Sequence, residues 1–380
     1  MKVISIGTDR NLFKEGSAVR DRQVEYGKLF DELHIIVFTT RGQYPPKIQL
    51  APNVWVYATK SLSKLTYIKR AVQIASQIIR EQKMSADDTV VSVQDPFESS
   101  IAGRRIKAAF GLPLHVQIHT DFLSPYFARE SAINRIRVHI AEKTMKQADA
   151  VRVVSDRIAE SLTMLEMKPG VVPAVLPIFV DVRKFQYAPP TVDLREKYSQ
   201  FNFTILVASR LTREKNISFA LDVFSRVLKF NPKAGLVIVG DGPEKSALRA
   251  KVKRLGISEN VVFEDWQNDL TSYYCTANLF LLTSNYEGYG MTLVESVAAH
   301  CPAISTDVGI AKTLLQDGIT LVCPIGDEDC FVEKISQLID DPSLRLNFAQ
   351  EADSRLSKVT ISDKQLYLQA YKQNIESALG

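Results

Sequence analysis

The chain has 380 residues, 46% of them hydrophobic, and a formal net charge of +4 at pH 7. This length is enough for large buried cores and favours two domains. No apolar run approaches the roughly 20 residues that a membrane-spanning helix needs, and the stretch from Met1 to Gly7 lacks the layout of a signal peptide. We therefore predict no membrane span and expect a cytoplasmic protein.

The positive charge is concentrated in the N-terminal half. Residues 1–180 hold 25 Lys and Arg against 18 Asp and Glu, whereas residues 181–380 hold 22 against 25. Much of the excess lies in three segments where cations alternate with apolar residues: 60–83, 104–107 and 129–152. Such helices either lie on an anionic membrane surface or present a solvated face while their apolar side packs on their own sheet. The excess is modest and lacks a stacking platform, so nucleic acid is a poor candidate partner.

Four cysteines lie in the C-terminal half without a CxxC spacing: Cys275, Cys301, Cys323 and Cys330. We expect reduced thiols that fill small core volumes, in agreement with a reducing compartment. Their spacing does not predict a metal site.

Short runs rich in β-branched residues alternate with helical patterns along the whole chain. In the first half these runs cover residues 2–7, 33–38, 54–57, 89–93, 114–118 and 150–154. In the second half they cover residues 203–208, 235–240, 260–263, 278–282, 303–306 and 320–323. Their hydrophobicity is continuous rather than alternating, which favours strands buried on both faces and hence parallel sheets covered by helices. The predicted fold class is α/β, with the pattern repeated twice.

The stretch from Val171 to Pro190 carries four prolines and no helical period, so we place the linker between the two domains there. The predicted N-terminal domain is 1–180 and the predicted C-terminal domain is 181–359. Two such domains would leave a cleft at the carboxyl ends of their strands, where ligands of open parallel sheets bind.

Polar residues just past the predicted strands of the first half are candidates for that cleft. The first strand leads into a loop that reaches Gly16, and Ser17 is a candidate N-cap of the next helix. This loop is either a phosphate-approach loop, although not a GxGxxG one, or a plain turn. His119 directly follows another predicted strand. It is either a site residue or a strand-end histidine that local hydrogen bonds satisfy.

In the second half, the strand that ends at Ala208 runs into Arg210 and Lys215. Two cations at a strand-to-helix corner suit a diphosphate, and arginine can bind two of its oxygens at once. The alternative is a pair of surface charges at a helix entrance. The segment 239–244, VGDGPE, follows another strand and is interpreted as a structural turn.

Glu287 and Glu295 enclose a glycine-hinged turn and an apolar run with helical spacing. The glycines would lie at a helix entrance, where free backbone N–H groups bind anions such as a diphosphate. Glu287 would precede the helix and Glu295 would lie about one turn inside it, so both carboxylates would accept hydrogen bonds from hydroxyls beside that diphosphate. A surface loop before an ordinary helix is the alternative.

Together these motifs resemble the retaining glycosyltransferases of the GT-B fold, in particular family four. Members of that family move a sugar from a nucleotide diphosphate sugar to an acceptor. The resemblance covers most of the chain and is strongest from 203 to 325, where an Arg and a Lys after a strand, a VGDGP turn and an EGxG segment closing on a second Glu appear in order. It implies two Rossmann-like domains facing a cleft, with a C-terminal helix at about 360–380 that returns to the N-terminal domain.

The resemblance also implies roles for individual residues. The residues that it places at the reacting groups are His119, Arg210, Lys215 and Glu287. Of these, the two cations would hold the diphosphate and Glu287 the hydroxyls of the donor sugar. Glu295 would bind the ribose hydroxyls. The phosphates would meet the backbone of Gly290, Met291, Thr292 and Leu293, and the N-terminal domain would complete the donor site with Gly16, Ser17 and His119.

The chain departs from the family pattern at packing and turn positions. His300 stands where the family usually has glycine, and Ile310 replaces a second glycine after Gly309. The segment 178–180 replaces the usual Asn-Gly ahead of Asp181, and a Gly-Gly pair is reduced to Gly16 and Ser17. These departures concern loop geometry more than chemistry.

The predicted reaction moves a hexose-type sugar from a UDP or GDP sugar to a glycan or lipid-linked acceptor, with retention of the anomeric configuration. Cations and a helix N-terminus would stabilise the departing diphosphate without a metal or cofactor, since the sequence shows no Asp-x-Asp of the sort that would hold a divalent ion on the diphosphate. The basic N-terminal domain allows peripheral contact with the cytoplasmic face of a membrane. Alternatives are a nucleotide-sugar epimerase or a non-catalytic glycan or lipid binder. A Rossmann oxidoreductase is disfavoured because GxGxxG is missing.

Overall fold

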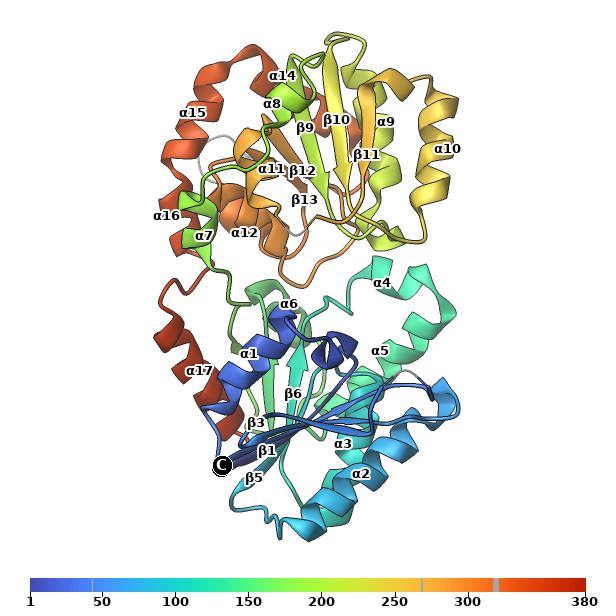
Figure 1. Ribbon diagram of the computed structural model, residues 1–380, viewed down its shortest axis with the longest axis vertical. Coiled ribbons are helices and arrows are strands. Elements are labelled where there is room, and N and C mark those ends of the chain that lie inside the picture. The colour runs from blue at the N-terminus through green and yellow to red at the C-terminus, as the bar shows by residue number, and fades with distance from the viewer. Residues whose placement is uncertain (43, 268, 317–320) are drawn as a thin grey trace. The chain divides into compact units, whose positions relative to one another are not determined.

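The computed structural model describes residues 1–380 apart from residues 43, 268 and 317–320, and these form two compact units (Figure 1). Unit 1 comprises Met1–Leu176 and Asp363–Gly380, and unit 2 comprises Pro177–Ser362. The domain boundaries predicted from the sequence lie after residues 180 and 359, and those of the structure lie after residues 176 and 362. Each unit is α/β with one central sheet, as predicted.

Unit 1 is built on an eight-stranded sheet in the order β3-β4-β2-β1-β5-β6-β7-β8. Neighbouring strands are parallel except β3, which is antiparallel to β4. The strands are β1 (Lys2–Gly7), β2 (Glu32–Val37), β3 (Lys47–Ala51), β4 (Val54–Ala58), β5 (Thr89–Val93), β6 (Leu114–Ile118), β7 (Ala150–Val153) and β8 (Ala174–Val175). The predicted strands are found to within a residue at either end. The two edge strands β3 and β8 were not predicted, because edge strands bury fewer residues and lose the continuous apolar signal.

Helices cover both faces of this sheet (Figure 1). The helices are α1 (Ala18–Gly27), α2 (Tyr67–Glu81), α3 (Glu98–Phe110), α4 (Pro125–Glu130), α5 (Ala132–Met145), α6 (Asp156–Leu162) and α17 (Lys364–Glu376), with 3-10 turns η1 (Arg10–Phe13) and η2 (Lys64–Thr66). On one face α3 packs against both α2 and α5. On the other lie α1 and α17, joined by the stacked rings of Tyr26 and Tyr371.

The C-terminal helix α17 belongs to unit 1, which confirms the predicted return of the chain. Three buried polar contacts attach it to β6 and β7. Asn374 Oδ1 lies 2.8 Å from His115 Nε2, Gln117 donates to the Tyr371 hydroxyl, and Arg152 donates to the Tyr367 hydroxyl at 3.1 Å. Hydrogen bonds of this kind are costly to break one at a time, because each leaves a buried polar group without its partner.

Unit 2 is built on a six-stranded parallel sheet in the order β11-β10-β9-β12-β13-β14. The strands are β9 (Phe203–Ala208), β10 (Ala234–Val239), β11 (Val261–Glu264), β12 (Leu279–Leu282), β13 (Ala303–Thr306) and β14 (Val322–Cys323). The predicted strand at 320–323 includes Thr320, which lies outside the described residues. Strands β9, β10, β12 and β13 are wholly buried, as their continuous apolar runs predict.

The helices of unit 2 alternate with its strands. They are α7 (Val182–Tyr187), α8 (Leu194–Lys197), α9 (Ile217–Val227), α10 (Lys245–Leu255), α11 (Thr271–Thr276), α12 (Met291–Ala298), α13 (Ala311–Leu315), α14 (Glu328–Asp340), α15 (Pro342–Gln350) and α16 (Ala352–Ser357), with 3-10 turns η3 (Arg213–Lys215) and η4 (Ser258–Asn260).

The predicted linker at 171–190 is wrong in part, because it contains β8 and the helix α7. Asp181 starts α7 by accepting a hydrogen bond from the Lys184 N–H, which is how an N-cap satisfies a free donor. The helix then packs on α12. Its six residues are too few to show a helical period in the sequence.

The expectation of four reduced thiols is also wrong. Cys323 and Cys330 form a disulfide that joins the end of β14 to the first turn of α14. They lie seven positions apart in sequence, and the strand-to-helix turn brings them together. Cys275 and Cys301 are free thiols, and Cys301 is buried.

Across the described ranges, no helix is long and apolar enough to cross a bilayer. Within those same ranges, no group of three or more His, Cys, Asp or Glu side chains is arranged to hold a metal ion.

Candidate active site

The order of strands in unit 2 defines one place where a ligand is expected. From β9 the chain proceeds outward to β10 and β11, then returns beside β9 to form β12 and proceeds to β13 and β14 on the other side. The loops after β9 and β12 therefore flank a topological switch point, where ligands of open α/β sheets bind. The predicted Arg210 and Lys215 follow β9, and Glu287 follows β12.

Lys215 and Glu287 meet directly at this point. Lys215 Nζ lies 2.5 Å from Glu287 Oε1, and the Ser284 hydroxyl donates to the same oxygen at 2.7 Å. The two charged side chains are only 15% and 14% exposed, so water screens their attraction less than it would on the surface. An anion that enters here meets an ammonium group already held in position.

Backbone and side-chain hydrogen bonds hold the two loops together. The Asn285 N–H donates to the Glu214 carbonyl at 2.7 Å, and the Thr283 hydroxyl donates to the Lys215 carbonyl at 3.1 Å. Asn216 ends η3 in a left-handed conformation and donates its amide to Asn285 Oδ1 at 3.2 Å. The position of Lys215 is therefore set by the loop that carries Glu287.

Arg210 lies at the same corner but is much more exposed. Its side chain is 68% exposed and pairs with Glu214 Oε1 at 3.2 Å, a surface contact of the kind that contributes little to stability. The guanidinium can therefore turn toward an anionic ligand at small cost. The segment 239–244 supports this corner, since a Cβ at Gly240 would come within 2.0 Å of the Ser209 carbonyl oxygen.

The start of α12 presents backbone donors shortly after Glu287 in the chain. Gly290 is its N-cap, with a φ of 102° that favours glycine. Met291 and Thr292 are the first two helical residues, whose N–H groups have no acceptor within a helix. The Leu293 N–H donates to the Gly290 carbonyl at 2.9 Å and its side chain is fully buried, so the free donors come from the two residues before it.

Glu295 lies in the second turn of α12, largely buried. Its Oε2 accepts a hydrogen bond from the Tyr274 hydroxyl at 3.0 Å. Burial raises the pKa of Glu295 to about 7, against the lowering effects of the Tyr274 hydroxyl and the Lys184 ammonium. This carboxyl group therefore changes charge near neutral pH, unlike an ordinary glutamate.

Sequence reasoning missed several residues that complete this arrangement: Lys184, Glu214, Tyr274 and Ser284. Ser284 lies three residues before Glu287 in the same loop, and Glu214 lies beside Lys215, so both could have been found from their closeness to the motifs. Tyr274 and Lys184 come from helices far away in sequence, and only packing brings them to Glu295.

The predicted residues Gly16, Ser17 and His119 lie in unit 1. Gly16 has a φ of 69° and no atom within 4 Å of a Cβ built on it. Ser17 is the N-cap of α1, as predicted: its hydroxyl accepts from the Arg20 N–H at 3.3 Å and donates to the Asn11 carbonyl at 2.7 Å. The Ser17 hydroxyl thus has a structural role in holding the start of α1.

His119 directly follows β6 and is partly exposed at the carboxyl edge of the sheet. Burial and the cations Arg152 and Arg22 lower the pKa of His119 to about 3. The imidazole is therefore neutral at physiological pH and is a weak base. Two residues further on, Asp121 is buried and its pKa is raised by that burial.

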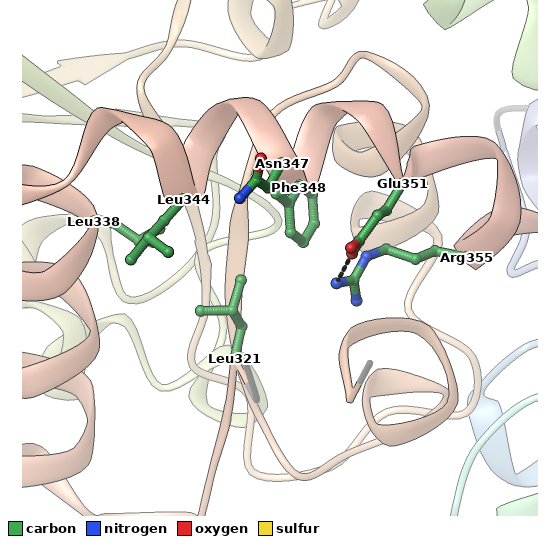
Figure 2. Close-up of a pocket in the computed structure, with 7 residues that line it drawn as sticks. All are labelled: Leu321, Leu338, Leu344, Asn347, Phe348, Glu351 and Arg355. Atoms are coloured by element: carbon green, nitrogen blue, oxygen red, sulfur yellow. Dashed lines mark hydrogen bonds and ion pairs between the residues drawn. The ribbon is translucent and has the colours of Figure 1, made fainter. Parts of the chain in front are cut away.

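A separate hollow of about 150 Å³ lies between α14, α15 and α16 and contains none of the predicted site residues. Figure 2 shows its lining, in which Glu351 and Arg355 are joined by an ion pair of 2.7 Å and the remaining side chains are mostly apolar. Because its only charges on the described residues neutralise each other, this hollow does not provide a site for a diphosphate.

Comparison with known proteins finds a family that is similar to unit 2. Residues 195–355 match the family described as glycosyl transferases group 1, and that segment contains Arg210, Lys215, Glu287 and Glu295. This segment, less than half of the chain, is similar to the group 1 glycosyltransferases. The match lies in unit 2 and spans both loops of the switch point.

Two relatives and one solved structure show how far the similarity of this chain extends. It is 35% identical over 150 residues to the amylovoran biosynthesis glycosyltransferase AmsD of Erwinia amylovora, covering 39% of this chain and 42% of that protein. It is 25% identical over 348 residues to N-acetyl-alpha-D-glucosaminyl L-malate synthase of Bacillus anthracis, covering 90% and 89% of the two chains. The structure of a sucrose-phosphate synthase from Thermosynechococcus elongatus superposes with a TM-score of 0.80 at 16% identity, covering 99% of this chain and 100% of that one. This shows the GT-B fold over both units.

Proposed function

We propose that this protein transfers a hexose-type sugar from a UDP or GDP sugar to a glycan or lipid-linked acceptor, with retention of the anomeric configuration and without a metal ion. The observation that carries the proposal is the Lys215–Glu287 pair, 2.5 Å apart at the switch point of unit 2. An ammonium group, a carboxylate and free backbone N–H groups lie together there, and a nucleotide diphosphate sugar offers phosphates and hydroxyls that match all three.

Charge development explains the expected chemistry. When the bond between the anomeric carbon and the diphosphate breaks, negative charge grows on the leaving phosphate. Lys215, Arg210 and the start of α12 would stabilise that charge, and such stabilisation supplies much of the rate enhancement of many enzymes. Glu287 would accept hydrogen bonds from sugar hydroxyls, and the acceptor would attack on the face that the phosphate leaves, with the phosphate taking its proton. The low pKa of His119 favours a role in contacting the sugar rather than as a general base.

The proposed acceptor side lies in unit 1, and its surface favours contact with an anionic membrane. Six large apolar side chains of the described part of unit 1 are at least 60% exposed: Leu62, Leu65, Ile133, Ile136, Met164 and Val172. Leu62 and Leu65 precede α2, Leu65 within η2, and Ile133 and Ile136 lie in the first two turns of α5; both helices pack against α3. Lysine and arginine side chains surround them in sequence, which suits anionic lipid headgroups. A membrane-bound acceptor fits this surface better than a soluble sugar does.

Two other functions use the same switch point. A nucleotide-sugar epimerase would convert the donor without any acceptor. A non-catalytic glycan or lipid binder would keep its effect after the ion pair is removed. Neither is favoured by a particular contact in the structure.

The first test is thermal unfolding with a panel of UDP and GDP sugars. A ligand at 100 times its dissociation constant stabilises the folded state by about 2.7 kcal/mol, so the matching donor should raise Tm by several degrees. Lys215→Ala should abolish this rise and lower turnover by roughly 100-fold or more, since removal of one preorganised donor has that effect. Turnover should persist in excess chelator.

Arg213→Ala is the matched control, because Arg213 lies in the same 3-10 turn but is 75% exposed and pairs with Glu244 at 3.6 Å. It should behave like the wild type. Absence of a shift with every nucleotide sugar, or product formation from the donor alone, would contradict the proposal.

A further inference from the structure

Tyr274 fixes one oxygen of Glu295 from behind the proposed donor site. Its hydroxyl donates to Glu295 Oε2 at 3.0 Å. Tyr274 belongs to α11 and is among the largest fully buried side chains of the molecule, whereas Glu295 on α12 retains partial exposure. The contact therefore joins a buried donor to a carboxylate whose other oxygen can face a ligand.

The Tyr274 ring is held on two sides. It packs edge-on against Phe280 of β12, with centroids 5.4 Å apart, and against Phe185 of α7, with centroids 6.2 Å apart. A ring held in this way has little freedom to move its hydroxyl. The hydroxyl is a fixed point, and the flexible glutamate side chain is the partner that is positioned.

Apart from the Tyr274 hydroxyl, few polar or charged groups act on the Glu295 carboxyl group. α12 packs against α7, α11, α16, β12 and β13, and neither strand carries a charged residue. The charged or titratable side chains on the three helices are Arg183, Lys184, Tyr187, Tyr273, Tyr274, Cys275, Asp353 and Arg355. Three of these have other partners. Asp353 accepts a hydrogen bond from Gln186, Arg355 forms an ion pair with Glu351, and Tyr273 donates to Glu264. Lys184 is the cation that favours the charged form of Glu295.

We propose that Tyr274 is a positioning residue, whose hydroxyl orients the Glu295 carboxylate and keeps it ionised so that its remaining oxygen accepts hydrogen bonds from the ribose hydroxyls of the donor. This inference rests on the proposed function, because it needs a nucleotide sugar at the switch point. It goes further by making donor affinity dependent on pH and by assigning that dependence to one hydroxyl group.

The direction of the effect follows from the charges. The carboxylate is a stronger acceptor for the ribose hydroxyls than the neutral carboxyl group, so donor binding is strong above the pKa of Glu295 and weakens as the pH falls through about 7. Removing the Tyr274 hydroxyl removes a hydrogen bond to the charged form, which moves this transition to higher pH. At pH 7 the Tyr274→Phe variant should then have a donor KM about fivefold higher, with kcat much less affected, for a hydrogen bond of typical strength.

The experiment measures donor KM and kcat from pH 5.5 to 9 for the full-length wild type and Tyr274→Phe. The probe is the nucleotide sugar that gives the largest thermal shift among UDP-glucose, UDP-N-acetylglucosamine and GDP-mannose. These intact donors carry no group that titrates near pH 7, so the profile reports on the protein. A displaced midpoint in Tyr274→Phe supports the inference, and an unchanged midpoint overturns it.

Two further variants separate positioning from folding. Tyr273→Phe removes a hydroxyl from the neighbouring residue of α11, which donates to Glu264 rather than to Glu295, and its midpoint should match the wild type. Glu295→Gln cannot ionise and should show a flat profile, and adding Tyr274→Phe to it should leave that profile flat. If Tyr273→Phe moves the midpoint as much as Tyr274→Phe does, the effect comes from α11 as a whole and the inference is wrong.

The two proposals fail in different ways. A wild type that binds none of the probes at any pH contradicts the proposed function and the role of Tyr274 together. A wild type that binds a donor with no change in KM between pH 5.5 and 9 leaves the proposed function standing and overturns the inference about Tyr274 and Glu295 alone.

Discussion

His300 adopts a left-handed backbone conformation, with a φ of 57°, at a position where the family pattern usually has glycine. It comes just after α12, and a left-handed residue is the common way to end a helix. A side chain with a Cβ is strained there, by roughly 1 kcal/mol relative to glycine. The His300 ring recovers part of this through Nδ1, which lies 3.0 Å from the Ala349 carbonyl oxygen. The departure from the pattern thus changes a side chain and keeps the backbone.

We expect His300→Gly to stabilise unit 2 by about 0.5–1 kcal/mol, because it relieves the left-handed strain. Urea unfolding at pH 7.5 measures the change. His300→Ala is the control, since it loses the ring contact with Ala349 and keeps the strained Cβ, and it should be no more stable than the wild type. A less stable glycine variant would show that the contact with Ala349 outweighs the strain.

At the scale of elements, α5 carries the strongest sign of a surface partner. Its exposed face presents Ile133 and Ile136, which are 60% and 61% exposed, beside the cations Arg135 and Lys143. Its other side supplies the buried Asn134, Ala141 and Met145. The segment 129–152 was interpreted either as a membrane-surface helix or as a helix that packs on its own sheet. Both have a physical basis, because one side of α5 packs against its own unit and the other offers apolar and cationic groups to an anionic surface.

Replacing both Ile133 and Ile136 by serine should reduce binding to vesicles of anionic phospholipid by about tenfold or more, because two large apolar side chains no longer enter the interface. Co-sedimentation with anionic and with neutral vesicles measures this. Leu346→Ser, which removes a 65% exposed side chain from unit 2, should have no effect. Equal binding of the wild type to neutral vesicles, or none to anionic ones, would argue against membrane contact.

At the scale of the whole molecule, unit 1 is closed by a segment from the far end of the chain. Residues 363–380 supply α17, which covers β5 and β7 and bonds the buried His115 through Asn374. Burial lowers the pKa of His115 to about 4, and the neighbouring Arg152 adds to the effect. The packing of α17 on unit 1 thus includes a hydrogen bond to a buried histidine that is neutral in the folded state.

This requirement predicts a loss of stability in acid. An unfolded histidine takes up its proton near pH 6.5, and folded His115 does so only near pH 4. Between these values the unfolded state binds more protons, so this contribution to stability is complete above pH 6.5 and is lost as the pH falls through 4, by up to about 3 kcal/mol. Unfolding by urea between pH 7.5 and 4 measures the slope, and His115→Gln should flatten it. His119, with its pKa near 3, adds a dependence of stability on pH with the same sign in the wild type and in His115→Gln.

The pattern of buried strands was readable from the sequence because it depends on local composition. Runs such as 203–208 and 114–118 are buried at every position, and such runs are stable only between two layers of helices. The same local logic found the N-cap Ser17 and the glycine entrance of α12. It missed α7 and the disulfide Cys323–Cys330, since a helix of six residues has no period to detect and cysteine pairing depends on how close two turns come in space.

The residue types of the candidate site were also determined by the sequence alone: Arg210 and Lys215 after one strand, Glu287 and Glu295 around one helix entrance. Only the tertiary structure decided which of them touch. It joined Lys215 to Glu287 and left Arg210 exposed beside Glu214. It also placed the buried Tyr274 behind Glu295. The physical reason is that side-chain chemistry is local, whereas hydrogen bonds, burial and the pKa values that follow from them depend on neighbours that only the packed fold supplies.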